Sequence, residues 1–262
     1  MSERFEVSDE IAAALRHGGP VVALETTLVT HGLPHPLGLE TAVAMEDRIR
    51  QAGALPATIG ILDGKLRVGL GPEELRSLAT SSEVAKVNLG NLAAQIASGK
   101  PGSTTVAASL FAAARAGIRV FATGGIGGVH RGDGTWDVSG DLLAISRYPV
   151  AVVCAGAKAI LDLPRTVEML ETLGVPILGV GVDRFPAFYR RDSGISLDAG
   201  FPSIASLAAA VRTHFAIGTG TGLIVANPIP AEQELPSELV DSAIERAIAA
   251  AASGCVRGRD VT

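Results

Sequence analysis

The chain has 262 residues, of which 47% are hydrophobic and 19% are charged, and it carries a formal net charge of −5. This composition is typical of a folded globular protein and lacks the charge richness of disordered chains. Such an acidic chain does not suit non-specific nucleic-acid binding, which needs clustered basic surface. The length allows one large α/β domain, and because no linker-like shift in composition interrupts it, we predict a single domain over residues 1–262.

The first half of the sequence alternates helical and strand patterns. Ser8 is a candidate N-cap for a short helix that ends at Arg16. Asp63-Gly64 is a two-residue hairpin signal between two apolar runs. The stretch GKPGST is expected to be a loop. The other expected strands are 21–24, 57–62, 65–70, 84–87 and 118–122, and the other expected helices are 37–51, 73–79, 92–97 and 105–116.

The second half continues the alternation. The expected strands are 149–156, 175–182 and 223–226, and the expected helices are 137–147, 164–173 and 238–251. Residues 183–198 form the longest irregular segment, and such segments are often active-site loops. Strands that alternate with helices predict a mainly parallel sheet covered by helices, and the one hairpin makes that sheet mixed.

The ends and the cysteines bear on the compartment. The N-terminal residues MSERFEVSDE are charged and lack the apolar core of a signal peptide. No run reaches the roughly 18 uncharged apolar residues that a membrane helix needs, so we predict a cytoplasmic protein with no membrane segment. The two cysteines, Cys154 and Cys255, provide no disulfide framework, and Cys154 falls in an apolar strand pattern typical of a buried thiol.

Lys158 follows the buried-strand pattern PVAVVCAG and a turn of small residues. This order predicts that its amine lies at the carboxyl end of a strand, the edge at which ligands bind in open α/β sheets. Apolar neighbours would leave the amine poorly solvated, which favours its neutral, nucleophilic form. The alternative is a surface lysine on the first turn of a helix.

Three glycine-containing segments differ from the known nucleotide-binding motifs. TGGIGGVHRG follows a strand, but His130 replaces the third glycine of the dinucleotide pattern, and GTGTG precedes a strand. AQIASGKP departs from a phosphate loop, because Ala94 and Pro101 replace its first glycine and its hydroxyl residue. We expect a phosphate or sugar cradle, which needs close approach of the backbone to the ligand, with tight structural turns as the alternative.

Acidic residues suggest an acid and a metal ligand. Glu25 ends the strand pattern VVALE, where apolar neighbours would raise its pKa and suit it to general-acid catalysis; a capping or salt-bridged role is the alternative. Asp137 and Asp141 are four residues apart, which on a helix places both on one face with Ser139 near the same end. Carboxylate oxygens suit Mg²⁺ or Mn²⁺, although Asp137 could instead cap the helix. An amine, a carboxylic acid and glycine-lined loops suit Schiff-base chemistry on a phosphorylated carbonyl compound or sugar.

Longer motifs carry a family resemblance. The strings VALETTLVTHGLPHP, GNLAAQIASGKPGSTTVAAS, FATGGIGGVHRG, DVSGDLLAISRYPVAVVCAGAKAILDLPRTVEMLETLGVP, FPAFYRRDSG and LIVANPIP occur in this order. They resemble the pseudouridine-5′-phosphate glycosidases, the family related to indigoidine synthase A, from about Val21 to Pro230. Compared with the family pattern, which usually continues with a further helical segment, the chain is shorter at its C-terminus.

The resemblance implies a fold, an activity and a set of site residues. The fold would be a three-layer α/β/α arrangement, and the assembly a homotrimer. The activity would be reversible cleavage of the C–C glycosidic bond of pseudouridine 5′-phosphate to uracil and ribose 5-phosphate, assisted by Mn²⁺, with Mg²⁺ or another divalent ion as the alternative. Lys158 would form an imine with C1′ of the ring-opened ribose, Glu25 would donate a proton, and Asp137 would hold the metal directly or through water. The residues expected around the substrate are Lys86, Val106, His130, Ser139, Gly140, Asp141 and Asn227.

Two other functions remain open on the sequence. One is a different Schiff-base-forming lyase or aldolase that acts on a phosphosugar. The other is a non-catalytic homologue that only binds a ligand.

Overall fold

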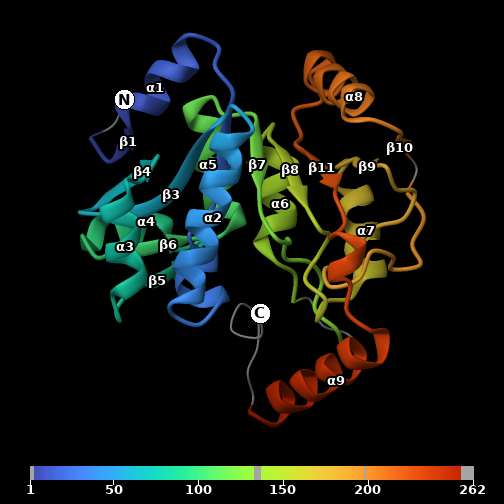
Figure 1. Cartoon of the computed structure of the whole chain (residues 1–262). Coiled ribbons are helices and arrows are strands. Elements are labelled where there is room, and N and C mark those ends of the chain that lie inside the picture. The colour runs from blue at the N-terminus through green and yellow to red at the C-terminus, as the bar shows by residue number, and fades with distance from the viewer. Residues whose placement is uncertain (1–2, 133–136, 198, 255–262) are drawn as a thin grey trace. The chain divides into compact units, whose positions relative to one another are not determined.

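The computed structural model describes residues 3–132, 137–197 and 199–254 (Figure 1). Packing divides the chain into two compact units, residues 1–122 and residues 123–262. Each unit contributes its own strands, and the fold as a whole is the predicted α/β class with a mixed, mostly parallel sheet and covering helices. The prediction of a single domain stays a prediction.

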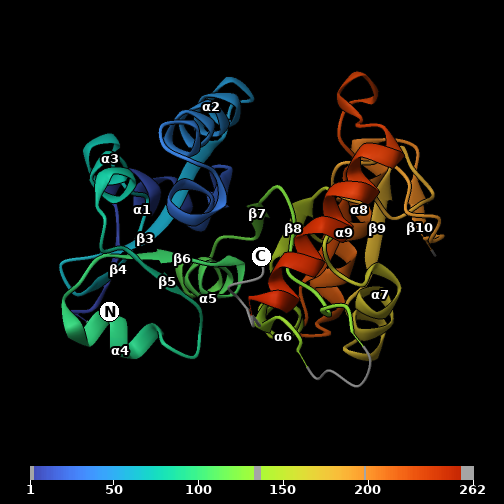
Figure 2. The ribbon, with the colours of Figure 1, turned by 90° about the horizontal axis from the view of Figure 1, so that it is seen from below.

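The first unit contains a mixed sheet in the order β1-β4-β3-β2-β7, and β6 pairs with both β3 and β5. Only the pairings of β3 with β4 and with β6 are antiparallel. Figure 2 shows α2 on one side of this sheet and α5 on the other. The strands are β1 (Phe5–Val7), β2 (Val21–Leu24), β3 (Leu55–Leu62), β4 (Lys65–Val68), β5 (Ala85–Val87), β6 (Gly102–Thr104) and β7 (Val120–Ala122), and the helices are α1 (Asp9–Arg16), the π-helical η1 (Leu28–Gly32), α2 (Leu37–Gln51), α3 (Pro72–Thr80), α4 (Leu92–Ser98) and α5 (Val106–Ala116).

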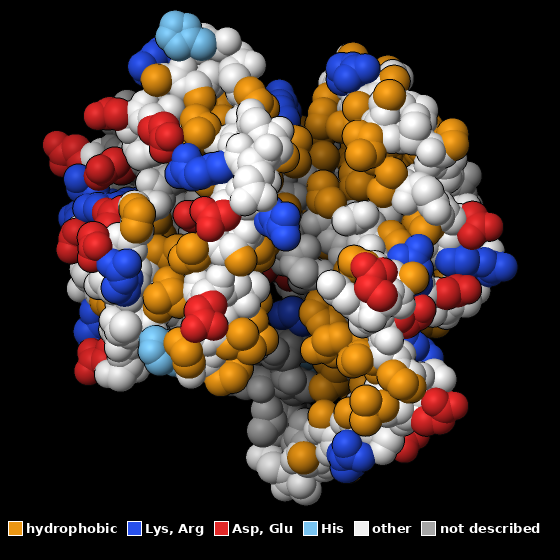
Figure 3. Space-filling view, in the orientation of Figure 1, with side chains coloured by type: hydrophobic (Ala, Val, Ile, Leu, Met, Phe, Trp, Pro, Cys, Tyr) orange, Lys and Arg blue, Asp and Glu red, His pale blue; other side chains and the backbone are white. Residues whose placement is uncertain are grey.

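The second unit contains a parallel sheet in the order β8-β11-β9-β10. Its strands are β8 (Ala151–Cys154), β9 (Ile177–Val180), β10 (Ala199–Phe201) and β11 (Leu223–Ala226). Its helices are α6 (Gly140–Arg147), α7 (Leu163–Thr172), α8 (Ile204–Ile217), the 3₁₀ turn η2 (Ala231–Gln233) and α9 (Ser237–Ser253). In Figure 3, hydrophobic side chains gather on α9, where Leu239 is exposed.

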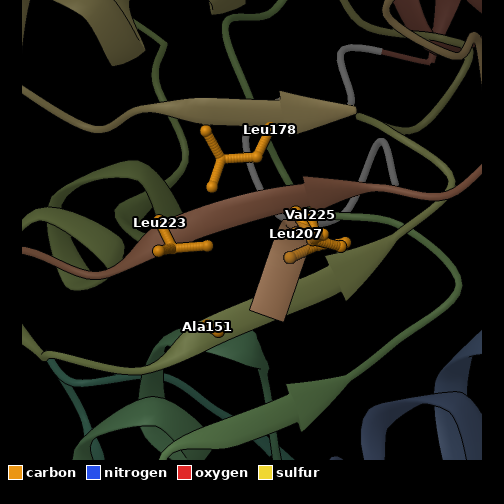
Figure 4. Close-up of a cluster of buried hydrophobic side chains, with 5 residues drawn as sticks. All are labelled: Ala151, Leu178, Leu207, Leu223 and Val225. Atoms are coloured by element: carbon orange, nitrogen blue, oxygen red, sulfur yellow. The ribbon is translucent and has the colours of Figure 1, made fainter. Parts of the chain in front are cut away.

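The alternating direction of side chains along a strand explains how the second sheet is buried. Leu223 and Val225 of β11 pack with Leu207 of α8 in one apolar cluster, which also contains Ala151 and Leu178 (Figure 4). The intervening residue of β11, Ile224, is also fully buried, so both faces of this strand are covered. A strand covered on both faces has a continuous apolar sequence, which is why LIVA was recognisable as a strand.

Two predicted features, one in each unit, were wrong. The helix expected from Asp137 begins at Gly140, because Ser139 takes the N-cap position and its hydroxyl accepts a hydrogen bond from the Asp141 N–H. Asp137 therefore neither caps the helix nor shares one of its faces with Asp141. The loop expected at GKPGST is also wrong in part, since Gly102–Thr104 forms the short strand β6.

Candidate active site

The predicted site residues divide between the two units. Glu25, Lys86 and Val106 belong to residues 1–122. Lys158, the expected nucleophile, belongs to residues 123–262, and with it come the residues expected around substrate and metal: His130, Asp137, Ser139, Gly140, Asp141 and Asn227. Each group has its own local geometry.

In the second unit, the glycine segment TGGIGG runs beside the loop that carries Lys158. The Ile126 N–H donates to the Gly156 carbonyl at 3.0 Å, and the Lys158 N–H donates to the Ile126 carbonyl at 3.0 Å. Further on, the Asp162 N–H donates to the Val129 carbonyl at 2.9 Å. These bonds continue the strand-like pairing beyond the carboxyl end of β8, so Lys158 is held against the glycine segment by its own backbone.

Lys158 lies between the strand and the next helix. β8 ends at Cys154 and α7 begins at Leu163, so the alternative of a lysine on the first turn of a helix is wrong. The carbonyl of Lys158 accepts a hydrogen bond from the Leu161 N–H at 3.0 Å, which closes a turn after the lysine. Lys158 is half-buried.

Ser139 and Asp141 contact the glycine segment directly. The Asp141 carboxylate is buried and accepts a hydrogen bond from the Gly127 N–H at 2.8 Å, while the Ser139 N–H donates to the Gly128 carbonyl at 2.9 Å. A side chain at Gly127 would collide with both Ser139 and Asp141. The glycines therefore permit close packing of the segment on the start of α6. The segment still lacks the third glycine of the dinucleotide-binding motif.

Asp137 and His130 face each other across a short bridge. The His130 N–H donates to the Asp137 carbonyl at 2.9 Å, and the His130 side chain is buried whereas Asp137 is half-buried. Within the described ranges, no group of three or more His, Cys, Asp or Glu side chains forms a metal cage. Asp137 as a metal ligand stays a prediction from the sequence.

Asn227 follows β11, and its N–H donates to the Cys154 carbonyl at 3.0 Å, so it lies beside the strand that leads to Lys158. Phe188 approaches the same edge, because its N–H donates to the Ala155 carbonyl at 3.0 Å. Phe188 adopts a left-handed backbone conformation (φ 67°), which is strained for a bulky residue. It belongs to the segment predicted to be irregular, and residues 183–197 indeed form neither helix nor strand.

Cys154 is the buried thiol that the sequence predicted. Burial raises its pKa to about 12, so the thiol stays protonated near neutral pH and does not act as a nucleophile. Cys255 lies outside the described residues.

In the first unit, Glu25 directly follows β2 and is half-buried. Lys86 lies in β5 in register with Ser103 of β6, and Val106 is the first residue of α5. The Thr105 N–H donates to the Val87 carbonyl at 2.9 Å, which holds the start of α5 beside β5. These contacts bring the Lys86 strand and the Val106 helix together.

Several threonines in this region were missed by sequence reasoning. Thr26 and Thr104 are fully buried and hydrogen-bonded to each other through the Thr104 N–H. The Thr105 hydroxyl oxygen is buried without a hydrogen-bond partner in the part of the chain that the structure describes. The only available signals were the dipeptides Thr26-Thr27 and Thr104-Thr105, and such pairs are too common to predict a site.

A cavity of about 360 Å³ lies elsewhere in the second unit, lined by parts of α7, β9 and the end of α8. It contains none of the predicted site residues. It also opens at the amino-terminal side of β9 and β10, whereas ligands of parallel sheets bind at the carboxyl ends. Its polar groups are engaged: His214 Nε2 lies 3.0 Å from the Thr221 carbonyl, and the Ser196 hydroxyl accepts from Arg184. The candidate site therefore stays at the residues that the sequence predicts, around Lys158.

Comparison with known proteins gives consistent matches. A protein of Methylobacterium nodulans named pseudouridine-5′-phosphate glycosidase is 50% identical over 259 residues, which cover 98% of this chain and 77% of that protein. One of the same name from Caldanaerobacter subterraneus subsp. tengcongensis is 46% identical, over 100% of this chain and 86% of that protein.

Solved structures agree. The prealnumycin C-glycosynthase in complex with ribulose 5-phosphate matches with a TM-score of 0.90 and 39% identity, over 100% of this chain and 85% of that chain. An indigoidine synthase A-like protein from Thermotoga maritima matches with a TM-score of 0.84 and 35% identity, over 92% of this chain and 80% of that chain.

Among the described residues, no helix is both long enough and apolar enough to cross a lipid bilayer. The pattern of the family described as indigoidine synthase A like protein matches residues 10–262. The chain therefore belongs to the indigoidine synthase A like family, as its motifs predicted.

Proposed function

We propose that this protein reversibly cleaves the C–C glycosidic bond of pseudouridine 5′-phosphate to give uracil and ribose 5-phosphate. The observation that carries the proposal is the sequence identity of 46–50%, over almost the whole chain, to proteins named for that activity. The solved C-glycosynthase with ribulose 5-phosphate supports a phosphosugar as the ligand class.

Lys158 is the proposed nucleophile. A carbon-bound base is a poor leaving group, so the bond needs activation at both of its ends. The lysine amine would bond to C1′ as the ring C1′–O4′ bond breaks and O4′ takes up a proton. The nitrogen lone pair would then form the imine at C1′ as the C1′–C5 bond breaks, and a proton delivered to C5 would let uracil leave as a neutral molecule. Water would hydrolyse the imine to give ribose 5-phosphate and free Lys158. The half-buried position of Lys158 beside the glycine segment supports this role.

Glu25 is the proposed proton donor. It directly follows the buried strand β2 and is half-buried, which supports a carboxylic acid at this edge of the sheet. Retaining and inverting glycosidases instead place two carboxylates around an oxocarbenium ion. The motifs supply one such carboxylate and a lysine, which fits the imine route better.

The remaining residues would bind substrate and metal. In the second unit, the residues proposed to contact the phosphosugar are His130, Ser139, Gly140, Asp141 and Asn227. In the first unit they are Lys86 and Val106. The unsatisfied Thr105 hydroxyl next to Val106 supports a polar ligand in that position. Asp137 would hold Mn²⁺, which when bound supplies positive charge to the substrate oxygens. The homotrimer implied by the sequence stays a prediction.

A second candidate is the formation of a C-glycoside from a phosphosugar and an acceptor other than uracil. The structural match to a C-glycosynthase favours it, since the two reactions differ chiefly in the base that joins the sugar. Incubation of ribose 5-phosphate with uracil and, separately, with other acceptors, followed by detection of the C-glycoside formed, separates the two candidates.

The test combines turnover with covalent trapping. We expect uracil release from pseudouridine 5′-phosphate, reduced when a chelator removes divalent ions and restored by Mn²⁺. Borohydride with ribose 5-phosphate should add one sugar to the protein at Lys158. Lys158→Ala should lose the adduct and at least about a thousandfold in kcat.

Lys100→Ala is the matched control, because Lys100 is an exposed lysine of the first unit. It should keep both the adduct and the activity. Wild-type protein that neither releases uracil nor forms the adduct would exclude the proposal, and an adduct on another lysine would reassign the nucleophile.

A further inference from the structure

Three elements of the first unit that carry proposed site residues converge on one buried residue, Thr104 of β6. We propose that the side-chain hydroxyls of Thr26, Thr27 and Thr104 are positioning groups that fix Glu25 relative to the substrate-binding segments of the same unit. The roles of Glu25, Lys86 and Val106 in this inference rest on the proposed function.

The backbone of Thr104 is held by the two residues that follow Glu25. The Thr104 N–H donates to the Thr26 hydroxyl oxygen at 3.0 Å, and the Thr27 hydroxyl donates to the Thr104 carbonyl at 2.7 Å. All three residues are buried, and Thr26 and Thr104 are fully so. A segment that begins one residue after Glu25 is therefore attached to both polar groups of a single peptide position in β6.

The hydroxyls of Thr26 and Thr104 also share a hydrogen-bond acceptor. The Thr26 hydroxyl and the Thr104 hydroxyl both donate to the Ile59 carbonyl of β3, at 2.8 and 2.7 Å. The Ser109 hydroxyl of α5 in turn donates to the Thr104 hydroxyl oxygen at 2.9 Å. Each hydroxyl thus has an acceptor, and Thr26 and Thr104 also receive a donor. In a dry interior, loss of one partner leaves a buried polar group unpaired, which is costly.

The network matters for the site because of what lies next to it. Thr104 is in register with Val87, the neighbour of Lys86, and lies two residues before Val106. Among the described strands, β2 pairs with β3 and β7 while β6 pairs with β3 and β5, so no backbone ladder joins β2 to β6. Side-chain hydroxyls make that connection, and a displacement of even about 1 Å in a catalytic group can cost about a hundredfold in rate.

Isosteric substitution separates the hydroxyl from the shape of the side chain. Thr26→Val keeps the volume but removes the acceptor of the Thr104 N–H, and Thr26→Ser keeps the hydroxyl. We expect Thr26→Val to lower kcat for uracil release about tenfold or more with little change in the Kd for ribose 5-phosphate, and Thr26→Ser to recover most of the wild-type kcat. Amide hydrogen exchange at residues 25–27 and 103–106 should be faster in Thr26→Val.

Ile11→Val is the control for a loss of stability alone, because Ile11 is a buried residue of α1 outside the network. It should lower the Tm without changing kcat or exchange at residues 25–27. Equal kcat losses in Thr26→Val and Ile11→Val, or exchange in Thr26→Val that matches the wild type, would overturn the positioning role. Wild-type protein that releases no uracil would overturn the proposed function instead, and the exchange measurement would still decide whether the hydroxyls hold the segment.

Discussion

Gly127 lies where the glycine segment touches the start of α6, and hydrogen is the only side chain that fits there. A Cβ at this position would collide with the Ser139 side chain and come within 2.8 Å of Asp141 Oδ2. The Gly127 N–H also donates a hydrogen bond to the Asp141 carboxylate, so the backbone of Gly127 is in direct contact with this side chain. Any larger side chain must move the two proposed substrate-binding residues.

We therefore expect Gly127→Ala to weaken ribose 5-phosphate binding by about tenfold or more, because Ser139 and Asp141 must shift. Gly124→Ala is a matched control in the same segment: its Cβ would meet the Phe188 ring at 3.8 Å, an ordinary contact. Calorimetric titration of both variants checks the prediction. If Gly127→Ala bound ribose 5-phosphate as tightly as Gly124→Ala, the start of α6 would not contribute to the sugar site.

At the level of single residues, the sequence predicted the position of the candidate nucleophile better than the contacts around the other site residues. Lys158 was identifiable because a continuous apolar strand precedes it, and its position beyond β8 is confirmed. Asp137 was placed on a helix because the four-residue spacing to Asp141 is helical, but the Ser139 N-cap starts the helix later. Thr26 and Thr104 were not predicted, since their role depends on contacts between residues that are 78 positions apart.

Among the elements, the hairpin of β3 and β4 is the one whose local sequence determines its geometry. Asp63 and Gly64 both have positive φ, 52° and 67°, as the tightest hairpin turns require. The turn sets the antiparallel register of Ile59–Leu62 against Lys65–Val68. The asparagine-like tolerance of aspartate and the freedom of glycine explain why this turn was predictable.

Gly64→Ala should destabilise the protein by about 2–3 kcal/mol, from left-handed strain and from a Cβ that would lie 3.0 Å from the Ile96 carbonyl oxygen. Gly53→Ala is the control, because Gly53 also has positive φ (82°) but has open space around its Cβ. That variant should lose only about 1–2 kcal/mol. Urea denaturation measures the free energy of unfolding of both variants. Equal losses would show that the close approach of the Gly64 Cβ to the Ile96 carbonyl oxygen does not lower stability.

Other elements were not predictable from local pattern. β6 consists of Gly102, Ser103 and Thr104, which show no apolar alternation, and it is a strand because β3 and β5 pair with it. The short strand β10 and the alanine-rich helix α8 were also missed. Alanine gives little contrast between the two faces of a helix, so the helical period of α8 is weak in the sequence.

For the whole molecule, the prediction of a single domain concerns whether the chain unfolds in one cooperative transition. The chain divides into two compact units, yet no linker separates them: β7 ends at Ala122, and the Thr123 N–H already donates to the Val153 carbonyl of β8. Domain boundaries normally fall in exposed polar segments that make few contacts. The absence of a linker-like shift in composition along the sequence was the reason for predicting one domain.

One domain implies one unfolding transition. Leu223→Ala in the second unit and Leu66→Ala in the first each truncate a side chain that is at most 1% exposed, and each should cost about 2–5 kcal/mol. If the chain folds as one cooperative unit, both variants lower the Tm of a single calorimetric peak whose calorimetric and van't Hoff enthalpies agree. Two peaks, of which each variant moves only one, would contradict the prediction and make residues 1–122 and 123–262 separate domains.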